Sequence, residues 1–230
     1  MIFSFKCLME IKLEKKLLNR EIIYNKLRED IVYCRLKPGV RLIEEEFTKK
    51  FNISKTPLRE ALSQLNAEGF VEYLPNRGVR VTSLSIKEVY EIYSIRAVLE
   101  GYAAGLAAKQ TTSEDVKKLD FFQRELEKHG RKKNFPGWLE NNTKFHLHIS
   151  EIGKNQNLFN TIQQFQRRVF RYGYLAISIP GHIGNYISIH RKVIEALINK
   201  DSNNAEQFMK KHLMEVRDIL ADFLEKYPGF

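Results

Sequence analysis

The sequence predicts a mostly α-helical protein built from a small N-terminal unit, in which short helices precede a β-hairpin, and a larger all-helical bundle. Two observations support this class. Runs typical of strands occur only before residue 82, and beyond it apolar residues recur at the three- to four-residue spacing of amphipathic helices. We divide the 230-residue chain into an N-terminal extension, the first unit, a linker and the bundle, at residues 1–18, 19–82, 83–86 and 87–227.

The first unit is expected to begin with a helix over residues 22–33, which is apolar along one face. A turn over residues 36–42 follows. A short helix then carries Phe47 and Phe51 and ends at a polar break that starts at Asn52. Two short helices on either side of such a break form a compact pair only if the second helix also buries an apolar stripe.

The second helix of this pair has that stripe. Ser54 or Thr56 is suited to be its N-cap, and Pro57 lies in the first turn, where no backbone N–H is needed. Gly69 supplies the C-terminal stop. The apolar stripe consists of Leu58, Ala61, Leu62 and Leu65. The side chains left facing outward near the N-terminal end of the helix are Lys55, Thr56, Arg59 and Ser63.

A hairpin is predicted directly after this helix. Residues 70–74 and 79–82 are rich in β-forming residues, and the turn between them contains Pro75, Arg77 and Gly78. The order of helix, turn, helix and hairpin is that of a winged helix-turn-helix domain, in which the second helix enters the DNA major groove. Arg77 at the hairpin tip can then reach phosphates or a narrow minor groove. The alternative is a small helical domain with an incidentally basic surface.

Composition agrees with a polyanionic partner without proving one. The formal net charge is +10, which favours nucleic acid but also fits a solvated basic surface. Cys7 and Cys34 are too few for a disulfide framework, which suits a reducing cytoplasm. No stretch has the apolar length of a membrane span, and the first residues lack the features of a signal peptide.

The bundle is expected to contain six helices. Capping boxes at residues 85–88 and 111–114 start the first two, and the first runs toward Ala108. Pro136 marks the start of a third helix through Ile152. Pro180 and Gly181 break the chain after the fourth. The last three helices are placed at residues 158–177, 186–200 and 203–224.

Four residues of the bundle form a candidate metal site. Asn142 and His146 are four residues apart and so lie on one face of a helix, while His190 and His212 belong to the last two helices. Three imidazoles and an amide oxygen would suit a divalent transition metal and leave coordination positions open. The alternative is that each histidine is a satisfied structural residue. We assign that role to His148, His129 and His182, the last two in expected loops.

Several segments resemble a known family. Leu36-Lys-Pro-Gly39, Ser54-Lys-Thr-Pro-Leu-Arg-Glu-Ala-Leu62 and Glu68-Gly-Phe-Val71 through Asn76-Arg-Gly78 resemble the winged-helix signature of the GntR superfamily of bacterial transcription regulators. The bundle resembles the FadR-type ligand-binding domain, called FCD, through residues 96–100, 142–146, 190–193 and 212–213. The resemblance implies DNA contact by Lys55, Thr56, Arg59, Arg77 and Gly78 and a metal held by Asn142, His146, His190 and His212.

Three positions depart from the family pattern. Lys55 stands where Arg is usual, and Lys lacks the planar fork that binds guanine with two hydrogen bonds. Asn142 stands where Asp is commoner, which removes one negative charge from the metal site. Glu45 is acidic where some relatives have a DNA-contacting Arg, so no contact is assigned to it.

The function that the sequence predicts is a metabolite-responsive, DNA-binding transcription regulator that is not an enzyme. We expect a cytoplasmic homodimer on an inverted-repeat operator, with Zn, Ni or Mn and a small carboxylate metabolite bound in the bundle. Arg96 is the candidate anchor for the carboxylate, with a helix-surface or interdomain salt bridge as its alternative role. Two other functions stay open: a metal-dependent enzyme, for which Glu151 is the nearest candidate base in sequence, and a sequence-indifferent DNA-binding protein.

Overall fold

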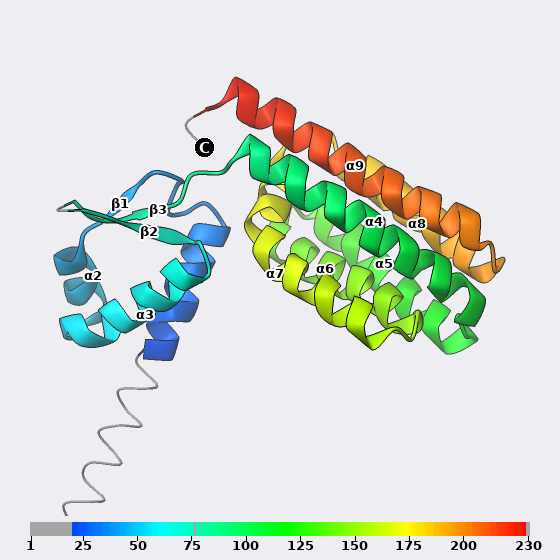
Figure 1. The fold of residues 1–230 in the computed structure, drawn as a ribbon, viewed down its shortest axis with the longest axis horizontal. Helices are drawn as coiled ribbons and strands as arrows, with labels where there is room; N and C mark the ends of the chain where they lie inside the picture. The colour runs from blue at the N-terminus through cyan, green and yellow to red at the C-terminus, as the bar shows by residue number, and fades with distance from the viewer. Residues whose placement is uncertain (1–19, 76, 229–230) are drawn as a thin grey trace, which may run out of the picture. The chain divides into compact units, whose positions relative to one another are not determined.

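The computed structural model describes residues 20–75 and 77–228, and the chain divides into two compact units after Ser83 (Figure 1). The N-terminal extension expected over residues 1–18 lies outside the described residues. The first unit combines helices with a small sheet, and the second consists of helices. The fold class predicted from the sequence, mostly α with a winged helix-turn-helix followed by a helical bundle, is therefore confirmed.

The first unit contains a helix over residues 20–32 followed by two short helices and three short strands. The helices are α2 (Glu44–Phe51) and α3 (Lys55–Ala67), and the strands are β1 (Arg41–Leu42), β2 (Val71–Leu74) and β3 (Gly78–Val81). The strands form an antiparallel sheet in the order β1-β3-β2, with Glu72 opposite Arg80 and Leu42 opposite Val79.

The predicted second helix of the pair, α3, forms as its sequence pattern indicates. Ser54 is the N-cap residue in extended conformation, and Pro57 lies in the first turn. Gly69 follows the C-cap residue with φ of +77°, a conformation that costs little only without a Cβ. The buried side of the helix consists of Pro57, Leu58, Ala61, Leu62 and Leu65.

One strand was not predicted. Residues 36–42 were expected to be a turn, but Arg41 and Leu42 pair with β3 as strand β1. The chain reverses at Gly39, whose φ is +76°, and the backbone N–H of Val81 then donates to the carbonyl of Val40. A two-residue strand has too little alternation to be recognised in a sequence.

The second unit consists of six long helices and contains no strand over residues 84–228. Figure 1 shows α4 and α9 side by side along their length. Gly101 and Gly105 lie where these helices meet, and a Cβ on Gly101 would lie 2.5 Å from Cγ of Lys210. The six helices are α4 (Ile86–Gln110), α5 (Ser113–Arg131), α6 (Phe135–Ile152), α7 (Gln156–Ser178), α8 (Ile183–Ile198) and α9 (Ser202–Lys226).

The two predicted capping boxes differ in detail from those observed. At α4, Ser85 accepts a hydrogen bond from the backbone of Glu88, but the Glu88 carboxylate binds the Tyr172 hydroxyl instead of the Ser85 backbone. The box predicted at residues 111–114 lies one residue later, at Thr112 and Asp115. The reason is that the Thr111 hydroxyl donates to the carbonyl of Ala107 and ends α4.

The other helix ends differ from the predictions by a few residues, because Asn134, Asn155 and Asp201 cap α6, α7 and α9 with their side chains. His129, expected in a loop, lies in the last turn of α5, whereas His182 immediately precedes α8. Within the described part of the chain, no helix combines the length and the apolar character that crossing a membrane requires.

Candidate functional site

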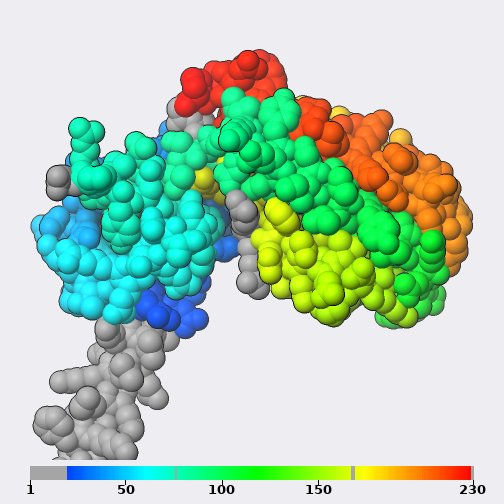
Figure 2. All heavy atoms as spheres, viewed as in Figure 1, coloured from blue at the N-terminus to red at the C-terminus, as the bar shows by residue number. Residues whose placement is uncertain are grey.

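The first candidate site is the exposed end of α3 together with the turn between β2 and β3. Lys55, Thr56 and Arg59 are exposed at the N-terminal end of α3, whose residues form part of the surface of the first unit (Figure 2, cyan). Arg77 and Gly78 are exposed in the turn. Gly78 has φ of +79°, which explains why glycine stands there. The structure thus places all the residues predicted to contact DNA on the surface of one unit.

The two long basic side chains of α3 are paired with carboxylates of α2. Nζ of Lys55 donates to Oε1 of Glu45 at 2.9 Å. Nε of Arg59 donates to both carboxylate oxygens of Glu44, at 3.1 and 3.0 Å. The sequence analysis gave no role to Glu44 and assigned no contact to Glu45. The only signal for them was the run of three acidic residues that opens α2.

The second candidate site is a cluster of three buried histidines in the helical unit. His146 lies on α6, His190 on α8 and His212 on α9, and a ligand nitrogen from each lies within 4.8 Å of the other two. Nε2 of His190 and Nε2 of His212 are 3.2 Å apart. The helices therefore bring together the three histidines that the sequence analysis selected.

Burial sets the charge state of two members of this cluster, His190 and His212. It lowers the pKa of His190 well below its usual value, and the nearby His146 imidazole lowers it further. Burial is also the main cause of the lowered pKa of His212, followed by His190 and His146. Both imidazoles are consequently neutral at pH 7. A neutral imidazole has the free electron pair that a metal ion requires.

A buried carboxylate orients the third histidine. Oε2 of Glu100 lies 2.7 Å from Nδ1 of His146, and Oε1 of Glu100 accepts from Nε of Arg96 at 2.7 Å. Burial disfavours the ionised form of Glu100, but Arg96 and then His146 outweigh it and lower its pKa to about 2. With Nδ1 bound to Glu100, Nε2 is the nitrogen of His146 that remains available to a ligand.

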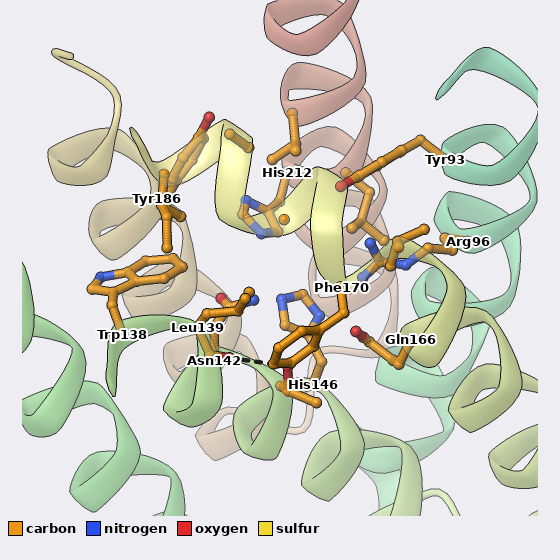
Figure 3. A pocket seen from close by; sticks show the side chains of 17 residues that line it. Tyr93, Arg96, Trp138, Leu139, Asn142, His146, Gln166, Phe170, Tyr186 and His212 are labelled. Atoms are coloured by element: carbon orange, nitrogen blue, oxygen red, sulfur yellow. Dashed lines mark hydrogen bonds between the residues drawn. The ribbon is translucent and has the colours of Figure 1, made fainter. Parts of the chain in front are cut away.

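Six polar atoms in this region are buried without a hydrogen-bond partner among the described residues. They are Oδ1 of Asn142, Nε2 of His146, Nδ1 of His190, Nδ1 of His212, Nε1 of Trp138 and the hydroxyl of Tyr186. Buried polar atoms are normally paired, so such a concentration points to a ligand. Three of these atoms, on Asn142, His146 and His212, have the chemistry of metal ligands and belong to side chains that line the same cavity (Figure 3).

This cavity lies beside the cluster. Asn142, His146 and His212 line it together with Arg96, and Figure 3 shows the four side chains around one space. Arg96 is buried, and its ion-pair partner is Glu100 on the same helix. Four residues of this region were not predicted from the sequence: Glu100, Gln166, Trp138 and Tyr186. The last three also line the cavity.

His148 and Glu151 do not line this cavity. His148 is buried and contacts Glu151 at 3.0 Å and Asp115 at 3.5 Å. Glu151, the nearest candidate base in the sequence, is thus engaged by a histidine that is not part of the cluster. The carboxylate that contacts the cluster is that of Glu100.

Comparison with known families identifies both units. Residues 19–81 match the model of the bacterial regulatory proteins of the gntR family, and residues 91–215 match the FCD domain. The chain belongs to the GntR family. Members of this family with an FCD domain are DNA-binding transcription regulators, and this chain is one of that type.

Curated relatives of this GntR-family chain are also regulators. It is 29% identical over 204 residues to the HTH-type transcriptional repressor RspR of Escherichia coli, covering 89% of this chain and 90% of that protein. It is 28% identical over 205 residues to the HTH-type transcriptional regulator YdhC of Bacillus subtilis, covering 88% and 91%. The Uxu operon transcriptional regulator of E. coli is 28% identical over 220 residues, which cover 86% of this chain and 84% of that protein.

Solved structures share the fold of this regulator. E. coli McbR/YncC superposes with a TM-score of 0.71 at 24% identity, over 89% of this chain and 98% of that one. A GntR regulator from Rhodococcus sp. RHA1 gives a TM-score of 0.70 at 21% identity, over 87% of this chain and 96% of that one. These likenesses show that the fold is shared over nearly the whole length of the solved chains.

Proposed function

We propose that this regulator binds a divalent transition metal and a small carboxylate metabolite in its helical unit and that the metabolite changes its affinity for an operator. The observation that carries the proposal is the convergence of His146, His190 and His212 within 4.8 Å of one another. They would hold the ion together with Asn142. Zn, Ni and Mn are the candidate metals.

The donor set fits such an ion. Burial and the neighbouring imidazoles keep the pKa values of His190 and His212 low. Neither ring therefore has to lose a proton before it binds a metal ion at pH 7. The 3.2 Å contact between their Nε2 atoms is a hydrogen bond only if one of the two neutral rings carries its N–H at Nε2, whereas a bound ion would accept the electron pairs of both rings. The Asn142 oxygen, which has no partner among the described residues, would have one.

The cavity supports a small organic acid as effector. Its lining combines apolar and aromatic side chains with a few polar groups, as small-molecule sites do, and it borders two of the histidines. A bound cation would supply positive charge for a carboxylate. Arg96 is proposed as a second contact, with its charge partly offset by the Glu100 carboxylate 2.7 Å from its Nε. Such an effector changes operator affinity only as far as its own affinity differs between the two states of the protein.

DNA contact is assigned to Lys55, Thr56 and Arg59 of α3 and to Arg77 and Gly78 of the turn. Their exposure on one unit supports this assignment. We further propose a cytoplasmic homodimer on an inverted repeat. Support comes from α4, where Ile95, Val98 and Tyr102 are exposed and apolar at helical spacing. An apolar stripe of this kind is normally covered by a partner.

The test is a footprinting experiment on fragments of the organism's own genome, repeated with chelator and with a panel of carboxylic acids ranked by thermal shift. Arg59→Ala should weaken binding to the protected fragment by about 1–3 kcal/mol. His190→Ala should lower the metal content while the first unit still binds DNA. Equal metal content in variant and parent, or operator affinity that no bound acid changes, would refute the effector model.

A further inference from the structure

Surface carboxylates next to a DNA-contacting face are unfavourable for binding, yet α2 opens with Glu44, Glu45 and Glu46. Glu44 and Glu45 contact α3 directly through Arg59 and Lys55. Any role for them must therefore be compatible with DNA lying against α3. The DNA role of Lys55 and Arg59 is the one proposed above, and the inference below rests on it.

Stabilisation of the fold does not account for these ion pairs. The Lys55 and Glu45 side chains are 53% and 63% exposed, and the Arg59 side chain is 61% exposed. Exposed ion pairs contribute roughly 0–1 kcal/mol to stability, because water screens them and two long side chains must be ordered. What the pairs do change is the orientation and the charge that α3 presents to a ligand.

Glu44 restrains Arg59 in a particular way. Its two carboxylate oxygens accept from Nε, at 3.1 and 3.0 Å. Within the described part of the chain, the two terminal amino groups of Arg59 make no hydrogen bond. A guanidinium held at Nε keeps its outer edge free for two parallel hydrogen bonds, the arrangement that binds O6 and N7 of guanine.

Glu45 acts on Lys55 differently. An ammonium is a point charge whose attraction for phosphate does not depend on sequence, and Glu45 neutralises it at 2.9 Å. The hydrogen bond from Lys55 is the main cause of the lowered pKa of Glu45, so the carboxylate is charged. Phosphate must compete with the Glu45 carboxylate for the charge of Lys55, whereas a guanine can bind the free edge of Arg59 without displacing Glu44.

We propose that Glu44 and Glu45 are specificity-determining residues of the DNA-reading surface: Glu44 positions the Arg59 guanidinium for a guanine, and Glu45 suppresses phosphate binding by Lys55. The effect is a lower affinity for random duplex with little loss at the operator. Specificity is a difference between two affinities, so weakening the wrong complex raises it as well as strengthening the right one.

The experiment compares full-length Glu44→Gln, Glu45→Gln and Glu46→Gln with the parent. Glu46 is the matched control, since it lies in the same turn, is exposed and forms no ion pair within residues 20–75 and 77–228. The probes are a duplex selected by the parent protein from a random-sequence pool and a scrambled duplex of equal composition. Fluorescence anisotropy gives the dissociation constants at several salt concentrations, and thermal unfolding verifies that each variant is folded.

Glu45→Gln should bind scrambled duplex about two- to fivefold more tightly, and its salt slope should steepen by roughly one, because one more phosphate contact forms. Glu46→Gln should change this affinity by less than about twofold, from net charge alone. Glu44→Gln should lose discrimination at one guanine of the selected site. Replacing that base pair should weaken the parent by roughly 5- to 150-fold and Glu44→Gln by clearly less.

Two outcomes overturn the proposal. If Glu45→Gln and Glu46→Gln tighten scrambled-duplex binding equally, the effect is net charge and not the contact with Lys55. If Glu44→Gln keeps the full guanine preference, Glu44 does not position Arg59. An Arg59→Ala arm separates these failures from failure of the proposed DNA surface: unchanged binding of the selected duplex by Arg59→Ala would show that α3 itself is misassigned.

Discussion

Oε2 of Glu100 and Nδ1 of His146 lie 2.7 Å apart, and this contact joins a buried ion pair of α4 to the histidine cluster. The carboxylate requires a donor at Nδ1, so Nε2 is the nitrogen that can serve as electron-pair donor to a metal. Carboxylates that orient ligand histidines in this way tune metal affinity although they do not touch the ion.

Glu100→Gln should therefore weaken metal binding by about 10- to 100-fold. The amide is uncharged and orients the imidazole less strongly, and it also leaves Arg96 without its charged partner. The affinity is measured by competition with a chelating dye on protein shown to be folded by circular dichroism. Glu151→Gln is the control, because Glu151 contacts His148 in the same manner but outside the cluster. Equal losses in both variants would contradict the orienting role.

Asn142→Asp should strengthen metal binding by about tenfold or more, since a carboxylate adds a full negative charge beside the cation. Without metal the same variant should unfold more easily, because the oxygen at this position is buried without a partner among the described residues. Isothermal titration and thermal unfolding with and without chelator measure the two effects.

Asn141→Asp separates these effects from a general response to a new charge. Asn141 is buried one residue away, and its side chain donates to the carbonyl of Gly137 outside the cavity lining. This control should lose stability with and without metal and gain no affinity for it. A gain in affinity as large as that of Asn142→Asp would exclude Asn142 as a ligand.

Gly101→Ala should destabilise the helical unit by roughly 1–3 kcal/mol, the usual cost of overpacking. Its Cβ would lie 2.5 Å from Cγ of Lys210, so the Lys210 side chain would have to change rotamer or α4 and α9 would have to separate. Gly184→Ala, which meets no atom within 4 Å, should instead be neutral or stabilising by up to about 1 kcal/mol. Urea unfolding of both variants measures the difference, and similar stabilities would show that α4 and α9 tolerate the added carbon.

Features that depend on residues within a single helix could be predicted from the sequence. The apolar stripe of α3 and the N-cap Ser54 were predictable because they depend on residues close in the chain. The three clustered histidines were selected one helix at a time, with the resemblance as support. Pairings between elements were not predictable: Glu44 with Arg59 depends on how α2 packs against α3, and Glu100 with His146 joins residues 46 positions apart.

Arg96 illustrates the same limit within one helix. Its spacing of four from Glu100 permits an ion pair, but an exposed pair of that spacing would be unimportant. What makes it matter is burial of both side chains beside the cavity, which depends on the packing of the whole helical unit. Strand β1 was missed for a related reason, since two residues become a strand only through β3.

The metal-free protein should lose stability as the pH falls below about 6.5, the usual range for histidine. Burial lowers the pKa values of His190 and His212 in the folded state, so the unfolded chain takes up protons first. Stability then falls with decreasing pH from the unfolded pKa down to the lower folded values. Glu100 adds a further loss between about 4.5 and its folded pKa of about 2, because its ionised form is the one stabilised.

Metal should extend the stable range toward acid, since the bound ion excludes protons from the imidazoles. The measurement is the urea midpoint between pH 8 and pH 5, with and without saturating Zn²⁺. A doubly substituted His190→Gln, His212→Gln protein should show a flatter profile without metal and no shift with it. If the parent's metal-free midpoint does not change between pH 7.5 and 5.5, the two imidazoles are not held neutral by burial, and the donor set assigned to the ion is wrong.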